Sequence, residues 1–109
     1  MQIDKLRYAK EWELMKNAFP EFRAFSRPPQ FGWEGYLEGK RTGRLYGIVL
    51  TSMEITYPAY RPKVFINPRF GGNWLPDGSL CIDSRWDPAF HTFAGTLLRV
   101  IEYMEKNNA

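Results

Sequence analysis

The chain has only one cysteine and one histidine, Cys81 and His91, among its 109 residues. A single cysteine cannot form a disulfide within the chain. A structural zinc site needs four ligands, drawn mostly from these two residue types, so the chain has too few of them. We therefore expect neither an intramolecular disulfide nor a bound metal.

Long hydrophobic runs are also missing. No stretch reaches the roughly 18 consecutive apolar residues that a membrane span needs. The first residues, MQIDKLRYAKEWEL, are charged and lack the apolar core of a signal peptide. We expect a cytoplasmic protein without a membrane partner.

Clusters of one charge are missing as well, although the net charge is +3. A nucleic-acid-binding surface usually gathers lysines and arginines on one stretch or face. In this sequence they are dispersed among acidic and apolar residues. We do not expect nucleic acid as a partner.

Aromatic residues, in contrast, are abundant. The sequence holds four Trp, six Tyr and eight Phe, and 44% of its residues are hydrophobic. This composition is unlike that of disordered chains. A length of 109 residues suits one domain with one core, so we expect residues 1–109 to form a single domain.

Two segments, 4–19 and 92–106, are predicted helices. Asp4 and Thr92 are suited to cap their first turns, and Pro20 to end the first helix. In each segment, apolar residues recur at i, i+4, i+7 and i+11 on one face: Tyr8, Trp12, Met15 and Phe19, then Phe93, Leu97, Val100 and Met104.

The middle of the chain predicts strands. Residues 31–38 carry Phe31, Trp33 and Leu37 on one side, and the turn GKRTG follows. Residues 44–57, rich in β-branched and aromatic residues, form one long strand or two. Residues 63–67 form another short strand. We expect residues 21–30 to be a loop around a rigid proline pair.

Residues 68–91 show no regular period, and a long irregular segment in a small domain is usually functional. The predicted fold class is therefore α+β. It consists of an N-terminal helix, an antiparallel meander of three to four strands, an irregular segment that carries the site, and a second helix.

Cys81 lies in this irregular segment, within the stretch GGNWLPDGSLCIDSRWDP. A free cysteine is often a small buried apolar residue. A cysteine in an irregular segment between sheet and helix is easier to reach, and it reacts where the thiolate is favoured. The residues alone leave both interpretations open.

Four polar side chains accompany Cys81 in the sequence: Asn73, Asp83, Asp87 and His91. A Cys–His pair suits nucleophilic catalysis, but a lone histidine before a helix is also commonly structural. The Asn73 amide can donate to an oxyanion or can hold a loop. Either aspartate can take a proton from an amine, although for Asp83 we favour a role in the turn.

From Tyr57 to Met104 the sequence resembles the core of the ubiquitin-conjugating enzymes. YPAYRPKVFI is similar to the family's strand with its YP-x-x-P-P-K motif, with Arg61 in place of the first proline of the pair. In the family an asparagine precedes the catalytic cysteine by eight residues, and Asn73 and Cys81 keep that spacing.

The match continues on both sides of Cys81. Gly78 falls at the family's glycine, and Asp83 at the aspartate two residues past the cysteine. WDPAF, residues 86–90, is similar to the family's W-S-P-A-L, and LLRVI, residues 97–101, to the helix that follows. The upstream helix and strands fit in order, so the resemblance covers nearly the whole chain and implies the fold of this family.

The sequence also departs from the family. The usual His-Pro-Asn is Gly71-Gly72-Asn73, and the family's two C-terminal helices have no counterpart in the 109 residues. The acidic residue that often lies beyond the matching helix is absent, which leaves Asp87 and His91 as candidates for handling the incoming amine. Such a minimal form is similar to short conjugating-enzyme-like proteins of bacterial operons that carry a ubiquitin-like system.

The resemblance implies a mechanism and a site. An activating enzyme would pass the C-terminal glycine of a ubiquitin-like protein to Cys81 as a thioester, and an amine would then attack it. Asn73 would support the oxyanion or the loop, and Trp86 and Pro88 would pack the loop that walls the site. Neither a metal nor an organic cofactor is implied.

The resemblance also implies partner surfaces. Lys5, Arg7 and Lys10 on the first helix would contact the activating enzyme. The loops 57–62 and 86–90 would face a ligase or a protein substrate, with Tyr60, Arg61 and Phe90 as the candidate contact residues.

Two other functions remain open. The same fold can serve as a non-catalytic adaptor that binds a ubiquitin-like protein, although Cys81 at the matching position argues against this. A cysteine hydrolase that uses Cys81 and His91 is the third hypothesis.

Overall fold

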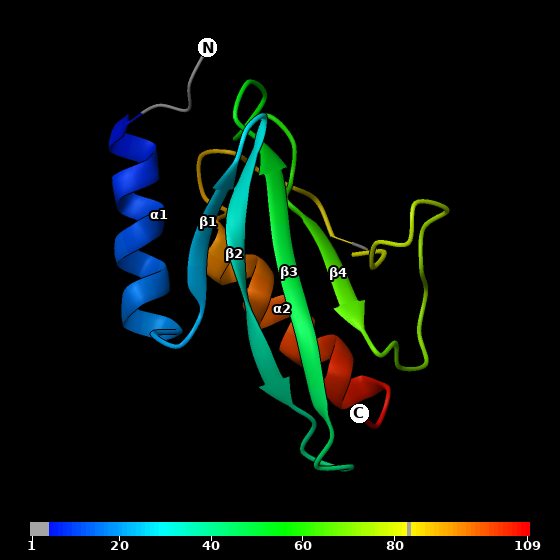
Figure 1. Ribbon diagram of the computed structural model, residues 1–109. Helices are drawn as coiled ribbons and strands as arrows, with labels where there is room; N and C mark the ends of the chain where they lie inside the picture. The colour runs from blue at the N-terminus through cyan, green and yellow to red at the C-terminus, as the bar shows by residue number, and fades with distance from the viewer. Residues whose placement is uncertain (1–4, 83) are drawn as a thin grey trace.

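The computed structural model describes residues 5–82 and 84–109 and has the predicted α+β order of elements (Figure 1). Asp4 and Asp83, the expected helix cap and turn residue, lie outside the described residues. The elements are helix α1 (Lys5–Ala18), strands β1 (Arg23–Arg27), β2 (Gln30–Glu38), β3 (Leu45–Met53) and β4 (Lys63–Asn67), and helix α2 (Phe93–Lys106).

The four strands form one antiparallel meander in the order β1-β2-β3-β4. Strands β2 and β3 pair along their whole length, from Gln30 opposite Met53 to Glu38 opposite Leu45. Alternate side chains of a strand point to the same face. One face therefore carries a set of buried apolar residues: Phe31, Trp33, Ile48, Leu50, Val64 and Ile66.

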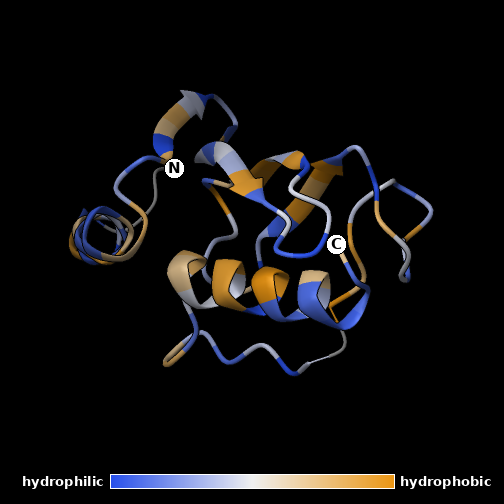
Figure 2. Ribbon diagram, turned by 90° about the horizontal axis from the view of Figure 1, so that it is seen from below, coloured by the Kyte–Doolittle hydropathy of each residue, from blue (hydrophilic) through white to orange (hydrophobic). Residues whose placement is uncertain are grey.

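Helix α2 covers this apolar face, as Figure 2 shows from below. It has the bounds that its pattern predicts, because Thr92 caps it: the Gly95 amide donates to Thr92 Oγ1 over 3.0 Å. Its four predicted core residues are all buried: Phe93, Leu97, Val100 and Met104. None of the helices among the described residues is long and apolar enough to cross a membrane.

The prediction of a loop over residues 21–30 is wrong. Residues 23–27 form β1 at the edge of the sheet, paired with β2, and Pro28-Pro29 is the two-residue turn between Arg27 and Gln30. An edge strand has one pairing partner and little burial, and only Ala24 and Phe25 of β1 are half-buried. Its sequence therefore lacks the alternation that reveals a strand.

The prediction of a strand that continues to residue 57 is also wrong, because β3 ends at Met53. The Tyr57 amide folds back to donate to the Met53 carbonyl over 3.0 Å. Strand β2 begins opposite Met53, so no neighbouring strand extends farther. The β-branched residues Ile55 and Thr56 therefore lie exposed in a turn.

Helix α1 lies within the predicted segment 4–19, but one residue of its predicted apolar face is misplaced. Trp12 is 45% exposed, whereas Glu11 is 0% exposed. The helix packs where α2 begins, and the first turn of a helix has amide donors without partners inside the helix. A carboxylate can satisfy such a donor, which is why Glu11 is turned inward and Trp12 is not.

Candidate active site

Residues 73–81 form a short hairpin, which we call the Cys81 hairpin. The Cys81 amide donates to the Asn73 carbonyl over 3.0 Å, and Trp74 pairs with Leu80 in an antiparallel bridge. Both pairs share one antiparallel register. The spacing of eight positions from Asn73 to Cys81 therefore brings the two backbones face to face.

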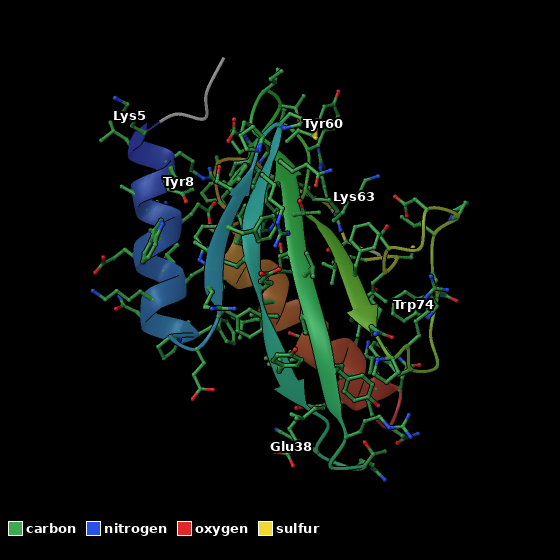
Figure 3. All side chains as sticks on the ribbon, viewed as in Figure 1. Lys5, Tyr8, Glu38, Tyr60, Lys63 and Trp74 are labelled. Atoms are coloured by element: carbon green, nitrogen blue, oxygen red, sulfur yellow. The ribbon has the colours of Figure 1, made fainter. Side chains whose placement is uncertain are left out.

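The tip of the Cys81 hairpin is tied by Asp77. Its Oδ1 accepts hydrogen bonds from the amide and the hydroxyl of Ser79, and its Oδ2 pairs with Lys63 Nζ at 2.6 Å. These hydrogen bonds, with that from Lys63 the strongest influence, hold the pKa of the Asp77 carboxyl well below its ordinary value. Figure 3 shows Lys63 at the start of β4 and Trp74 on the neighbouring irregular segment.

Gly78 occupies a position in this hairpin that favours glycine. Its φ is +92°, and a Cβ built there would lie 2.9 Å from Arg69 Nη2. Its amide donates to the Leu75 carbonyl over 2.9 Å and closes the tip. A residue with a side chain would be strained in this backbone conformation.

The inner strand of the hairpin is attached to the sheet on both sides of Cys81. The Leu80 amide donates to the Val64 carbonyl of β4 over 2.8 Å, and Arg61 Nη1 donates to the Ile82 carbonyl over 2.8 Å. Cys81 is half-buried, so this residue is not enclosed in the core. The Asn73 side chain is exposed and makes no hydrogen bond with the described residues.

The two candidate bases, Asp87 and His91, close one turn between them. Asp87 Oδ1 accepts from the Ala89 amide over 3.0 Å, and the Asp87 carbonyl accepts from the His91 amide over 2.8 Å. His91 Nδ1 accepts from the Asp87 amide over 2.7 Å, which in a neutral ring places the proton on Nε2. His91 then offers a donor, while Asp87 Oδ2 has no hydrogen-bond partner among the described residues.

Trp86 forms the wall between this turn and the loop after β3. Its indole Nε1 donates to the Pro58 carbonyl over 2.7 Å, and its ring lies 6.2 Å from the Tyr57 ring and 5.7 Å from His91. Pro88 is exposed, and its carbonyl accepts a hydrogen bond from Arg7. Trp86 and Pro88 are therefore held by contacts with segments far away in the sequence.

Arg7 connects α1 to the same turn. Its guanidinium donates to the carbonyls of Pro88 and His91, to the latter over 2.6 Å, and it contacts Glu11 and Tyr57. We expected Arg7 on the partner-facing surface of the helix, beside Lys5 and Lys10. Its side chain is instead only 14% exposed, and its nitrogens are used within the protein.

Glu11 holds Arg7 in place from the interior. Its Oε2 accepts from Arg7 Nε over 2.9 Å and from the Tyr57 hydroxyl, and its Oε1 accepts from the Phe93 amide at the start of α2 over 2.9 Å. We call Arg7, Glu11, Tyr57 and the Phe93 amide the Glu11 cluster. It joins α1, the loop after β3 and α2 through one buried carboxylate.

The Glu11 cluster shifts the acidity of its members. Burial raises the pKa of Tyr57 far above its ordinary value, and the neighbouring Glu11 carboxylate raises it further. For Arg7, burial opposes the charge, but the hydrogen bonds to Tyr57 and Glu11 outweigh it and raise the pKa. Near neutral pH the cluster therefore holds one cation and a neutral phenol.

The remaining candidate contact residues lie at the surface. Lys5 and Lys10 are exposed on α1. Tyr60 is 69% exposed and Phe90 79% exposed, on the two loops that were expected to face a partner. Figure 3 shows Tyr60 at one end of the sheet, with Lys5 at the neighbouring end of α1.

Sequence reasoning missed Glu11 and Tyr57 as parts of the site. The signal for Glu11 was its position, since Tyr8, Glu11 and Met15 follow each other at i, i+3 and i+7 on the apolar face of the helix. A charged residue at such a position is buried only if partners meet its charge. Nothing in the local sequence named those partners.

No protein-family model matches this chain, and no curated protein matches it significantly. Among residues 5–82 and 84–109, no three acidic, histidine or cysteine side chains gather where they could hold a metal ion.

Proposed function

We propose that this protein carries a ubiquitin-like protein as a thioester on Cys81 and transfers it to a substrate amine, as its resemblance to ubiquitin-conjugating enzymes implies. The observation that carries the proposal is the Cys81 hairpin. It brings the backbones of Cys81 and Asn73 together and leaves Cys81 half-buried in an irregular segment.

Two chemical steps follow from this assignment. In loading, the Cys81 thiolate attacks the activated C-terminal glycine of the modifier, and a C–S bond replaces the bond to the activating enzyme. In transfer, the amine nitrogen attacks the thioester carbon, the C–N bond forms, the C–S bond breaks, and Cys81 leaves as thiolate. The Asn73 amide is exposed and able to turn toward the developing oxyanion.

The proton of the attacking amine needs an acceptor, and of the two candidates we propose Asp87 for this role because of its unused oxygen. Asp87 Oδ2 makes no hydrogen bond with the described residues, whereas His91 Nδ1 already accepts one and leaves Nε2 as a donor. Asp87→Asn keeps the Oδ1 contact to the Ala89 amide but removes the base. We expect it to slow discharge of the thioester by about a hundredfold without slowing loading.

A non-reducing gel tests the proposal. The protein is mixed with ATP and with the activating enzyme and ubiquitin-like protein of the same genome. The expected result is an adduct that thiols cleave, absent in Cys81→Ala and replaced in Cys81→Ser by an ester that resists thiols. Failure of any adduct to form while the ubiquitin-like protein still binds would establish the adaptor function instead.

The hydrolase hypothesis makes a different prediction in the same samples. It requires release of a C-terminal group from the ubiquitin-like protein without ATP and without the activating enzyme. That release would depend on both Cys81 and His91. Observing it would refute a conjugating role.

A further inference from the structure

A small pocket lies beside the Cys81 hairpin, lined by Ile82, by residues 84–86 and by the first turns of α2. Its volume is about 70 Å³, and Ile82 and Trp86 are among its lining residues. This is room for about two water molecules. The pocket therefore suits the tip of one side chain and is too small for a nucleotide.

Four basic side chains line this pocket from three parts of the chain. Arg61 comes from the loop after β3, Arg85 and His91 from the irregular segment, and Arg99 from α2. No carboxylate is found among the lining residues within the described part of the chain. Guanidinium groups stay charged at all physiological pH values, so the pocket has a positive potential.

These arginines have nitrogens to offer a ligand. Arg61 uses one Nη to donate to the Ile82 carbonyl, which fixes the guanidinium at the pocket. Arg99 pairs with Glu102 over 3.5 Å, but both side chains are more than half exposed, and such a pair is weak and exchangeable. Arg85 is exposed and has no ion pair with the residues that the structure describes.

We propose that this pocket binds a carboxylate side chain of the acceptor protein, close to the lysine that attacks the thioester. The inference rests on the proposed function and adds a substrate class: lysines with an acidic residue nearby. Arginine suits this task because its planar fork matches a carboxylate with two hydrogen bonds.

The same charges explain why an acidic neighbour is required. A lysine ammonium approaching alone would meet three guanidinium groups and would be repelled. A carboxylate on the same peptide reverses this interaction and holds the amine beside Cys81.

The test compares two acceptor peptides in a single-turnover reaction. Both carry one lysine, flanked in one by glutamates and in the other by glutamines. Discharge of preformed thioester to the glutamate peptide should be about fivefold faster at low salt, since exposed ion pairs contribute this much. The preference should shrink at high ionic strength.

Charge reversal at the pocket sharpens the test. Arg85→Glu should abolish or invert the preference between the two peptides. Arg44→Glu is the matched control, because Arg44 is equally exposed but lies near the β2–β3 turn and away from the pocket. Equal discharge to both peptides by the unmodified protein would overturn the inference.

The readouts separate this inference from the proposed function. If no thioester forms, the proposed function fails, and NMR titration of the unloaded protein with the glutamate peptide still tests the pocket. Shifts at Arg61 and Arg99 that appear in the unmodified protein and are absent in Arg85→Glu would support it, and no shift in the unmodified protein would refute it. If Arg85→Glu slows loading but not discharge, the pocket serves the modifier and the inference is wrong.

Discussion

The irregular segment 68–91 is held in different ways at its two ends. The Cys81 hairpin forms its first part, and the Glu11 cluster holds its last turn through Arg7. In the cluster, a carboxylate that is 0% exposed meets a guanidinium, a phenol and a helix amide. In the hairpin, an exposed Asp77 ties a turn and pairs with Lys63. The first carboxylate is buried in the interior, and the second is exposed at the tip of the hairpin.

This difference predicts unequal consequences of mutation. A buried charge that loses its partner cannot be rehydrated, whereas an exposed one can. The side with Arg7 and Asp87 should therefore govern stability and the position of the turn. The exposed Asn73 side chain can change its contacts at small cost, which is compatible with the proposed thioester role of Cys81.

The largest effect is expected for Glu11→Ala, which leaves Arg7, the Tyr57 hydroxyl and the Phe93 amide without their shared acceptor. We expect a loss of about 3–5 kcal/mol in the free energy of unfolding, measured by urea denaturation. Glu13 lies two residues farther along the helix and is exposed, so Glu13→Ala should change the free energy of unfolding by less than about 0.5 kcal/mol.

If Glu11→Ala does not fold, Glu11→Gln answers the same question. It keeps a side-chain oxygen for the Phe93 amide and removes only the charge, so the loss should be smaller. Equal stability of Glu11→Gln and the unmodified protein would mean that the charge of the cluster is unimportant.

Tyr57→Phe should have the next largest effect, a loss of about 1–3 kcal/mol, because the buried Glu11 oxygen loses a donor. It should also change how the free energy of unfolding depends on pH in alkaline solution. The pKa of Tyr57 is raised in the folded state, so its contribution is complete below the unfolded pKa of about 10 and falls as pH rises above it. Between about pH 8 and about pH 11, the free energy of unfolding should therefore depend less on pH for the variant than for the unmodified protein.

Gly78→Ala should cost less, about 1–2 kcal/mol, since alanine at φ +92° is strained and its Cβ would meet Arg69. The hairpin should shift its register, so alkylation of Cys81 by iodoacetamide should change in rate. Gly71→Ala is the matched control, because a Cβ there meets nothing within 4 Å. An equal effect of both changes would contradict the role assigned to the Gly78 conformation.

The smallest effect is expected for Asp77→Asn. The pKa of Asp77 is lowered in the folded protein, so its contribution is present above the unfolded pKa of about 4 and is lost as pH falls. The variant should therefore be slightly less stable at neutral pH. Its free energy of unfolding should also fall less than that of the unmodified protein as the pH drops below about 4. A larger loss than that of Glu11→Ala would reverse the comparison of the two sides.

Much of the fold could be predicted for elements that have one buried face and one exposed face, because such elements show a periodic pattern of apolar residues. Helix α2 begins after the Thr92 cap and ends at Lys106 as predicted, and Phe31 and Trp33 lie on one buried face of β2 as expected. Strand β1 could not be predicted, because an edge strand buries little and its turn is a proline pair that also suits a loop.

For the site, the sequence by itself determined the eight-residue spacing of Asn73 and Cys81, because backbone pairing across a short hairpin depends on the number of residues between its two ends. Only the tertiary structure decided that Glu11 is buried, that Arg7 turns inward, and that four basic side chains surround one pocket. Burial of a charge depends on partners that arrive from other elements, and no local pattern specifies them.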